Sequence, residues 1–490
     1  MAHVTIGIDI GTTGVKGIAL DTERGLLAQE TRANTLSSPQ AGWAEASTDQ
    51  WLANVVDVLS ALASSPLVVP SEVVAIATTG MVPAVVCQDD AGRALRPAIL
   101  QNDARASGEV AELAEALAPH DPLGRTGSPV TQQSVAPTAL WLERNEPESW
   151  ARTRTLLGSY DWLLFALGAD PHIERNWALE SGLFTVDGEP FAPAWGATEV
   201  GARLPPVRGS GEVVGTLDAS IAARVGLPPG VALVVGGADH VLSAYAAGLA
   251  SEGDWLVKLG GAGDILTVSA SPLVDRRFYL DEHPIEGLWL PNGCMATSGS
   301  LVRWVQALIG GPDLREMDDE AERRGAAEIL CLPYFLGEKS PLNDPDLRGV
   351  FAGLHLGHDR VDLYRSALEG IAFGFRHNAD AMREAGLSLA RATVTNGGAT
   401  SLLWKRIHAS VLGVPLRTVL GHPGASLGAA VAAAVGVGAL DGWRDVGRFV
   451  VEGEEIEPDP ALVARYDGAY GLWRELSEVT ASTARAMARL

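Results

Sequence analysis

A strand, a glycine-rich turn and a second strand open the chain, and this pattern limits the folds that the chain can adopt. Apolar residues alternate along the first strand at Ile6, Ile8 and Ile10, and a second strand covers residues 15–20. The turn between them combines glycine, which lets a backbone approach an anion closely, with threonine hydroxyls that donate hydrogen bonds. We interpret the stretch as a phosphate-binding hairpin, and the alternative is a simple tight hairpin.

The side chains of this hairpin suit a phosphate that carries a bound magnesium ion. Gly11, Thr12 and Thr13 are the candidate phosphate-binding residues, and Asp9 is the candidate Mg²⁺ ligand, acting through water. Lys16 adds a cation on the second strand, where it either binds phosphate or is an ordinary solvated lysine. The alternative for Asp9 is a carboxylate that caps the turn.

Two better-known phosphate motifs are absent from the sequence. No Gly-Lys dipeptide occurs anywhere in the chain, so there is no Walker A loop. The spacing of Gly11, Gly14 and Gly17 does not match G-x-G-x-x-G, and a strand rather than a helix follows. The dinucleotide-binding fingerprint is therefore excluded.

Residues 424–428 match the G-x-S-x-G nucleophile elbow of α/β-hydrolases. That fold requires a histidine after the serine, but the last histidine of this chain is His422, which precedes Ser426. We therefore exclude a hydrolase and interpret the stretch as the start of a helix that small residues allow to pack closely.

The opening pattern returns in the second half of the chain. Residues 255–259 predict a strand, 260–264 a glycine-rich turn and 265–268 a second strand. Two such units predict a duplicated fold with one phosphate loop in each half. We place the boundary near residues 247–253, which gives domains 1–248 and 249–490.

Strand and helix patterns alternate along the rest of the chain, which indicates an α/β fold. The predicted elements are helices at 48–63, 105–117 and 401–412, strands at 73–77, 231–235 and 392–395, an irregular connection at 187–208, and a turn at 396–399. The longest apolar run, 429–440, is short and interrupted by glycine. It predicts a buried helix rather than a membrane span.

Charge and cysteine content narrow the function further. The chain carries 60 acidic and 37 basic residues, a net charge of −23, which repels nucleic acid and anionic membranes. Cys87, Cys294 and Cys331 are far apart and form no metal-binding pattern, so neither disulfides nor structural zinc are expected. No signal peptide is visible at the start of the sequence. These features favour a reducing, cytoplasmic environment.

Several motifs together resemble the FGGY family of carbohydrate kinases, within the actin/hexokinase superfamily. Residues 349–354 and 362–369, seven residues apart, match the C-terminal signature of that family. Residues 332–341 resemble the LPYLxGERxP stretch of its xylulose kinase subgroup, and residues 43–45 and 101–105 lie where that subgroup has W-x-E and W-N-D-x-R. The similarity extends over essentially the whole chain.

The resemblance implies an α/β fold of two actin-like (ribonuclease H-like) lobes with a deep cleft between them. It implies ATP- and Mg²⁺-dependent phosphorylation of a small ketose, most closely a xylulose-type sugar, with the sugar and ATP as partners. A homodimer is left open.

The resemblance also implies roles for individual residues of both halves. Asp239 matches the family's catalytic base in G-G-x-D, whereas its position alone favours a helix N-cap. The residues implied to bind ATP, beside those of the first hairpin, are Gly260, Gly261, Gly397, Gly398 and Ala399. The candidate sugar-binding residues are Met81, Asp103, Arg105, Gln133, Asp239 and His240. For Asp103 and Arg105 a mutual ion pair with a structural role is the alternative.

The chain departs from the family pattern at four places. Thr138 stands where a lysine is usual, residues 260–263 lack the usual loop hydroxyls, Val82 replaces a sugar-contacting histidine, and Gln101 replaces a tryptophan. The sugar therefore stays open, with another polyol, a sugar acid or an autoinducer-like furanone as alternatives. A nucleotide-regulated binding protein with little kinase activity is the alternative from another functional class.

Overall fold

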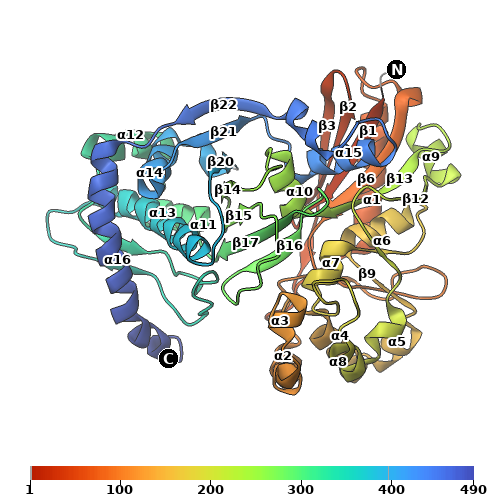
Figure 1. Cartoon of the computed structure of the whole chain (residues 1–490), viewed down its shortest axis with the longest axis horizontal. Coiled ribbons are helices and arrows are strands. Elements are labelled where there is room, and N and C mark those ends of the chain that lie inside the picture. The colour runs from red at the N-terminus through yellow and green to blue at the C-terminus, as the bar shows by residue number, and fades with distance from the viewer. Residues whose placement is uncertain (1–2, 396) are drawn as a thin grey trace.

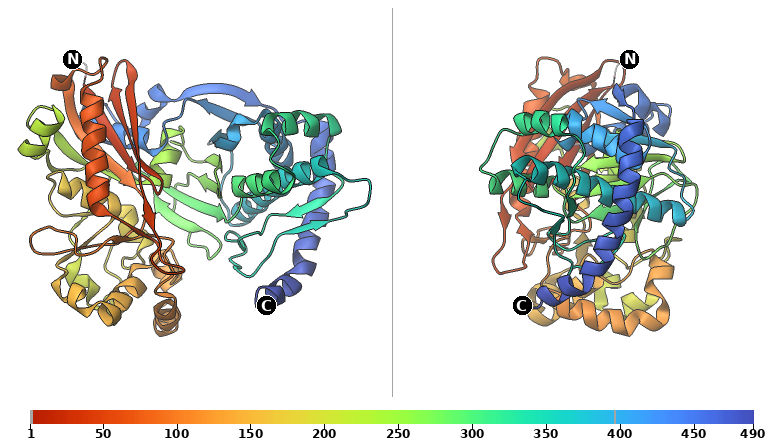
Figure 2. Two further views of the ribbon diagram at one scale, coloured as in Figure 1. Left: turned by 180° about the vertical axis from the view of Figure 1, so that it is seen from behind. Right: turned by 90° about the vertical axis from the view of Figure 1, so that its left-hand side faces the viewer.

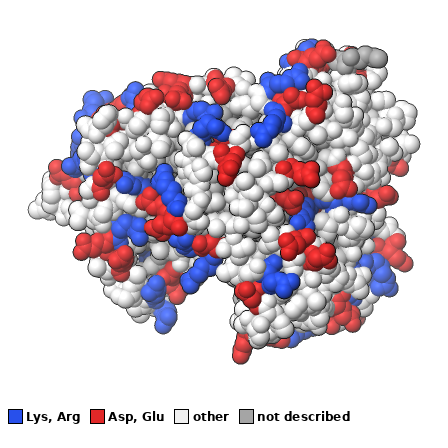
Figure 3. Space-filling model, viewed as in Figure 1, with Lys and Arg blue, Asp and Glu red and all other residues white. Residues whose placement is uncertain are grey.

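The computed structural model describes residues 3–395 and 397–490, which form two α/β lobes, as predicted (Figure 1). The first lobe lies on the right of Figure 1 and the second on the left. Each lobe is built around one large mixed sheet. The surface is hollowed between the lobes, at the lower middle of the face in Figure 3, where acidic and basic side chains are interspersed.

The sheet of the first lobe has the strand order β12-β13-β6-β1-β2-β3. Its strands are β1 (Val4–Ile10), β2 (Gly14–Asp21), β3 (Gly25–Ala33), β6 (Val73–Gly80), β12 (Val213–Thr216) and β13 (Ala232–Ala238). The chain turns back twice, from β1 to β2 and from β2 to β3, in antiparallel pairs. On the other side of β1, the strands β6 and β13 run parallel to it.

The sheet of the second lobe repeats this arrangement. Its order is β16-β17-β15-β14-β20-β21-β22, with β14 (Asp254–Leu259), β15 (Gly263–Thr267), β16 (Tyr279–Glu282), β17 (Trp289–Met295), β20 (Arg391–Thr395), β21 (Leu416–Leu420) and β22 (Val451–Ile456). The strand β14 is antiparallel to β15 and parallel to β20, as β1 is to β2 and β6. The predicted duplication is therefore confirmed at the level of strand order.

The remaining elements surround the two sheets. The helices are α1 (Thr48–Ala63), α2 (Ser107–Leu117), α3 (Pro122–Thr126), α4 (Val135–Asn145), α5 (Pro147–Arg152), α6 (Ser159–Ala166), α7 (Arg175–Glu180), α8 (Ala192–Ala197), α9 (Ala219–Val225), α10 (Asp239–Ala246), α11 (Gly299–Leu308), α12 (Leu314–Arg324), α13 (Arg360–Glu384), α14 (Leu402–Leu412), α15 (Ala425–Gly436) and α16 (Pro460–Met487). Short strands are β4 (Leu36–Ser37), β5 (Glu45–Ala46), β7 (Val86–Gln88), β8 (Ala98–Ile99), β9 (Thr155–Leu157), β10 (Ile173–Glu174), β11 (Val207–Arg208), β18 (Leu330–Leu332) and β19 (Val350–Ala352). In the described part of the chain, no helix combines the length and apolarity that crossing a membrane requires.

Two helices from opposite ends of the chain cover the two faces of the first sheet. The helix α15 lies in front of it in Figure 1, and α1 lies in front when the molecule is seen from behind in Figure 2. Strand residues alternate between the faces, so Ile6 and Ile8 pack with α1 while Gly7 faces α15. A Cβ on Gly7 would lie 1.9 Å from the carbonyl oxygen of Ser426. The close packing predicted for the start of this helix is thus present.

Three details differ from the sequence-based expectations. The segment 187–208, predicted to be irregular, contains α8, a 3₁₀ turn at Glu199–Arg203 and β11. The turn predicted at 396–399 includes a 3₁₀ helix at Gly397–Thr400, while Asn396 lies outside the described residues. The helix α15 follows the predicted boundary at 248/249 yet packs on the first sheet, because its small residues match the close approach at β1.

Candidate functional site

The first hairpin holds two opposite charges that do not pair with each other. Asp9 on β1 and Lys16 on β2 occupy directly opposite positions of the ladder. The Lys16 ammonium instead donates a hydrogen bond to the Pro423 carbonyl oxygen at 2.5 Å, and its side chain is partly buried. The solvated-lysine alternative is therefore wrong. Among the described residues, nothing hydrogen-bonds to the buried Oδ1 atom of Asp9.

The surroundings of Asp9 disfavour a bare negative charge. Burial, and next the charge of Asp239, raise the pKa of Asp9 to about 7, against the opposing effect of Lys16 and Lys258. A divalent cation beside the unpaired oxygen would supply the missing partner and reverse this effect. The residues present therefore fit a magnesium site at Asp9.

In the second hairpin, the two opposite charges pair with each other. Lys258 on β14 lies opposite Asp264 on β15, and their side chains form an ion pair with an N–O distance of 3.0 Å. The charge of Asp264 holds the pKa of Lys258 above its usual value. The loop between the strands is held by the start of α11, since the backbone N–H groups of Ser298 and Ser300 donate to the Gly261 carbonyl.

A cavity of about 700 Å³ lies in the second lobe beside this loop. Four of the predicted nucleotide-binding glycines line it, Gly260, Gly261, Gly397 and Gly398, together with residues of α11, α12 and α14. A Cβ on Gly398 would lie 2.3 Å from the Trp404 ring, so only glycine fits against this side chain. Ala399 and the first-hairpin residues Gly11, Thr12 and Thr13 are not part of the lining.

Asp239 lies where three parallel strands of the first sheet end. It follows β13, as Met81 follows β6 and the Gly11 turn follows β1, and such carboxyl ends gather ligands in α/β folds. Asp239 is the first residue of α10, its predecessor Ala238 occupies the N-cap position, and no side-chain capping bond is made there. The N-cap alternative is therefore wrong, and 38% of the Asp239 side chain remains exposed.

A second cavity, of about 220 Å³, brings both lobes together at Asp239. The first lobe contributes Met81, Val82, Gln101, Gln133, Glu180, Asp239 and His240, and the second contributes Lys258, Asp264, Leu266, Tyr279, Asp281, Asn292, Cys294 and Lys339. Four predicted sugar-binding residues are thus gathered in one place. Sequence reasoning missed Glu180 and the acidic residues of the second lobe, although the scarcity of lysine was a usable signal for Lys258 and Lys339.

Asp103 and Arg105 do not line this cavity; they form the ion pair that the sequence left open. The Arg105 guanidinium bonds Asp103 and Glu45, each at 2.8 Å, and stacks 3.8 Å from the centroid of the Trp43 ring. Asp103 also accepts a bond from the Ala44 backbone N–H at 2.6 Å. These buried contacts join the stretches 43–45 and 101–105, which supports a structural role for the pair.

His240 contacts carboxylates from both lobes in the interlobe cavity. Its Nε2 atom lies 2.8 Å from Oδ2 of Asp281, and its Nδ1 atom lies 3.5 Å from Oδ1 of Asp239. Burial by itself lowers the pKa of His240, but the charge of Asp281, the hydrogen bonds that the ring donates to Asp239 and Asp281, and the charge of Glu180 raise it well above its usual value. The surrounding carboxylates therefore favour the protonated ring beside the candidate base.

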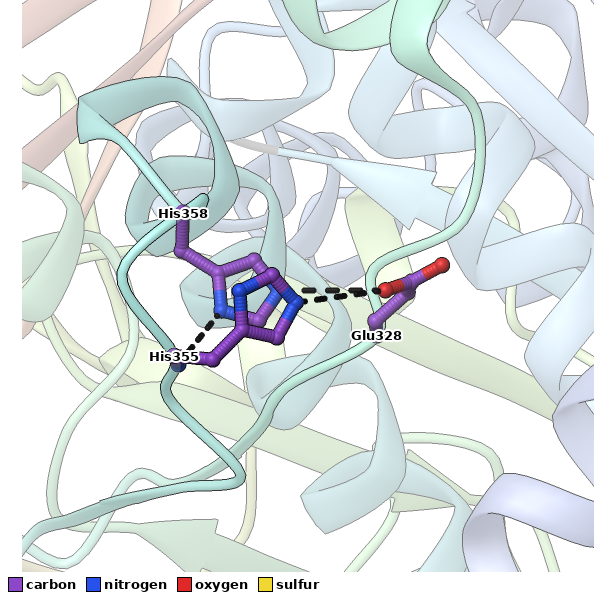
Figure 4. Close-up of side chains that lie close together, drawn as sticks. All are labelled: Glu328, His355 and His358. Carbon is purple, nitrogen blue, oxygen red and sulfur yellow. Dashed lines mark hydrogen bonds and ion pairs between the residues drawn. The ribbon is translucent and has the colours of Figure 1, made fainter.

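A second group of metal-type side chains lies in the second lobe, at Glu328, His355 and His358 (Figure 4). The two imidazoles stack with 3.7 Å between their centroids, and their Nε2 atoms lie 3.9 and 3.8 Å from the Glu328 carboxylate. Both Nδ1 atoms accept backbone N–H groups, from Gly357 and His355. The neutral rings then carry hydrogen on Nε2, which leaves no lone pair there for a metal. We assign no metal to this group.

Comparison with known proteins agrees with this two-lobed site. The N-terminal domain of the FGGY family of carbohydrate kinases matches residues 4–246, and the C-terminal domain of that family matches residues 264–437. The crystal structure of xylulose kinase from Rhodospirillum rubrum is 39% identical, with a TM-score of 0.92, over 98% of this chain and 100% of that one. A xylulose kinase from Staphylococcus epidermidis is 27% identical over 98% of this chain and 97% of its own length. The L-xylulose/3-keto-L-gulonate kinase of Escherichia coli is also 27% identical, over 91% of both chains. The chain therefore belongs to the FGGY family of carbohydrate kinases, and it is a sugar kinase that uses ATP.

Proposed function

We propose that this kinase transfers the γ-phosphoryl group of ATP to a terminal hydroxyl of a small ketose, most closely a xylulose-type ketopentose. The observation that carries the proposal is the position of Asp239, which is free of helix capping and faces a cavity lined by both lobes. The names of the similar proteins favour xylulose among the sugars.

Asp239 is the proposed base for the transfer. A carboxylate there accepts the proton of the attacking sugar hydroxyl as the bond to phosphorus forms. The His240 ring, whose Nδ1 atom lies 3.5 Å from Oδ1 of Asp239, orients that carboxylate. Charge and geometry together support this end of the cavity as the place of transfer.

The nucleotide is proposed to occupy the 700 Å³ cavity, with its phosphates directed toward the first hairpin. Gly260, Gly261, Gly397 and Gly398 let the backbone pass close to it, and Gly11, Thr12 and Thr13 donate hydrogen bonds from the other side. Lys16 contributes positive charge near the phosphates while anchored to Pro423. Asp9 would hold Mg²⁺, which supplies neutralisation of phosphate charge.

The sugar is proposed to contact Met81, Gln133, Asp239 and His240. Because Val82 cannot donate the hydrogen bond of the family's usual histidine, the geometry supports a ketose more generally than D-xylulose alone. The unpaired cysteines Cys87, Cys294 and Cys331 support a reducing, cytoplasmic compartment, which we include in the proposal.

The proposal is tested by coupled measurement of ADP formation with a panel of ketopentoses, polyols and sugar acids. We expect at least one ketose or polyol to stimulate ADP formation well above the hydrolytic background, and chelation of Mg²⁺ to abolish it. Binding of ATP with no stimulation by any member of the panel would contradict the proposal and favour a nucleotide-regulated binding protein.

A further inference from the structure

One wall of the interlobe cavity is a cluster of three charged side chains from three elements. Glu180 ends α7, His240 lies in α10 and Asp281 lies in β16. Oδ2 of Asp281 accepts hydrogen bonds from His240 Nε2 at 2.8 Å and from Asn292 Nδ2 at 2.6 Å. Glu180 Oε1 lies 3.8 Å from the same ring nitrogen. The imidazole is therefore fixed, with its Nε2 hydrogen directed at Asp281.

This wall also carries buried oxygen atoms that nothing else in the protein satisfies. Oδ1 of Asp281, Oε1 of Glu180 and Oε1 of Gln101 are buried and have no hydrogen-bonding partner among the described residues. The Asp281 side chain is fully buried and that of Glu180 is 10% exposed. All three residues line the same cavity. Buried acceptors are almost always paired in proteins, so a bound ligand is the natural source of their donors.

The hydrogen-bonding character of the two carboxyl groups decides which ligand group fits them. Burial, and next the charge of Asp281, raise the pKa of Glu180 well above its usual value, which favours its protonated, donating form. Asp281 accepts hydrogen bonds from His240 and Asn292, so the wall offers both a donor and an acceptor. A hydroxyl group donates and accepts at once and satisfies both. A carboxylate can only accept, and Asp281 and Asp239 repel it.

We propose that Glu180, His240 and Asp281 form the specificity-determining site for the hydroxyl groups of the sugar, and that they select against a carboxylate at this position. The inference rests on the proposed sugar phosphorylation in this cavity. His240 lines the cavity and joins Asp281 to Asp239, because its two ring nitrogens lie 2.8 and 3.5 Å from their carboxylates. These residues would bind the sugar hydroxyl groups other than the one that Asp239 deprotonates.

Lys339 is the competing feature of the cavity. Its side chain is exposed, and no carboxylate of the described residues lies within ion-pairing distance of its ammonium group. A sugar acid would use this cation, whereas a neutral sugar bound at Asp281 would not depend on it. Lys339→Met therefore separates the two classes of substrate.

The experiment measures sugar binding to the full chain by calorimetry, without ATP, for the wild type, Asp281→Asn, Glu180→Gln and Lys339→Met. The probes are D-xylulose, D-ribulose and xylitol, the monodeoxy analogues of each, and the acids D-gluconate and 3-keto-L-gulonate. Glu282→Gln is the matched control, since Glu282 adjoins Asp281 but bonds Arg175 and does not line the cavity. Thermal unfolding of every variant checks that it is folded.

We expect a neutral probe to bind the wild type more tightly than either acid, and at least one of its deoxy analogues to bind roughly 10–100-fold more weakly. Asp281→Asn should weaken binding of the parent sugar by a similar factor. It should also reduce the ratio of the affinities for the parent and deoxy sugars to about 3 or less. Glu282→Gln and Lys339→Met should leave that ratio unchanged. If Asp281→Asn is unfolded, the same comparison is made with Glu180→Gln.

Three results would overturn the inference: an unchanged parent-to-deoxy ratio in both carboxyl variants, tighter binding of an acid that Lys339→Met abolishes, or no binding of any probe. ADP formation measured on the same samples tests the proposed function separately. Sugar binding that follows the expected pattern without ADP formation contradicts the proposed function and leaves the specificity site standing. ADP formation with unchanged ratios contradicts the specificity site alone.

Discussion

The two hairpins that open the sheets have the same place in their lobes and opposite electrostatics. In each, a charged residue two positions before the loop faces an opposite charge across the ladder: Asp9 and Lys16 in the first, Lys258 and Asp264 in the second. The second pair forms an ion pair at 3.0 Å, while Lys16 turns to the Pro423 carbonyl and leaves Asp9 unpaired. The second hairpin thus pairs its charges internally, whereas the first leaves a buried carboxylate oxygen available for the proposed Mg²⁺.

The largest expected effect concerns Asp239, which lies between the hairpins. Asp239→Ala should lower kcat by roughly 10²–10⁴-fold, because the proton acceptor is lost. The free energy of unfolding should change by less than about 0.5 kcal/mol, because the side chain caps no helix. Steady-state ADP formation and urea denaturation measure the two quantities.

Asp218→Ala is the matched control for that experiment. Asp218 does cap α9, accepting bonds from the backbone N–H groups of Ser220 and Ile221. Its removal should cost about 1 kcal/mol of stability and leave kcat unchanged. If Asp239→Ala behaves like this control instead, the base lies elsewhere.

The next effect breaks the first hairpin. Asp9→Asn keeps the shape of the side chain but removes the charge that a cation requires, so kcat should fall by roughly 10²-fold or more at saturating ATP. The loss should be accompanied by a higher Mg²⁺ requirement in a titration of ADP formation. A variant with wild-type turnover and an unchanged Mg²⁺ requirement would remove Asp9 from the site.

A smaller effect is expected from the second hairpin. Asp264→Asn breaks the ion pair with Lys258. The Asp264 side chain is 26% exposed and that of Lys258 is 22% exposed, so the unfolding free energy should fall by about 1 kcal/mol. Turnover should fall less than about 10-fold, since neither residue of this pair is proposed to bind a metal ion. A loss of turnover as large as that of Asp9→Asn would show that the two hairpins are equivalent in function.

The sequence predicted those features that depend on residues close together in the chain, and missed those that depend on tertiary packing. Strand–turn–strand patterns are local, so both hairpins, the α/β class and the duplication were accessible from residues such as Ile6, Ile8 and Ile10. The position of Asp281 was not accessible, because β16 is short and its side chains reach the cavity only through packing of the two lobes. The packing of α15 on β1 is likewise tertiary, although Gly7 within a strand was its one local sign.

The same limit applies to the candidate site. Strand ends visible in the sequence placed Asp239 at the edge of a sheet, but the roles of Met81 and Asp239 were predicted from the family resemblance. Arg105 and Asp103 were misleading, since a charged loop pair looks the same whether it faces a ligand or a buried tryptophan such as Trp43.

The smallest expected effect is a pH dependence of stability that belongs to the first hairpin alone. The pKa of Asp9 is about 7 in the folded protein against 3.8 for an unperturbed carboxyl, so the folded state binds the proton more tightly. Without metal, the contribution of Asp9 to the free energy of unfolding should therefore fall by about 1 kcal/mol as the pH rises from 6 to 8. Urea denaturation of the wild type and Asp9→Asn at both pH values isolates this contribution, which should be missing in the variant. An equal slope in both proteins would contradict it.

The most direct test of the difference between the hairpins is metal binding itself. Electron paramagnetic resonance titration of Mn²⁺, in the presence of saturating ADP, measures the dissociation constant in the wild type, Asp9→Asn and Asp264→Asn. We expect one protein-bound Mn²⁺–nucleotide site in the wild type and in Asp264→Asn, and binding weakened roughly 10²-fold or more in Asp9→Asn. Equal Mn²⁺ affinity in Asp9→Asn and the wild type, or its loss in Asp264→Asn alone, would show that Asp9 does not hold the metal.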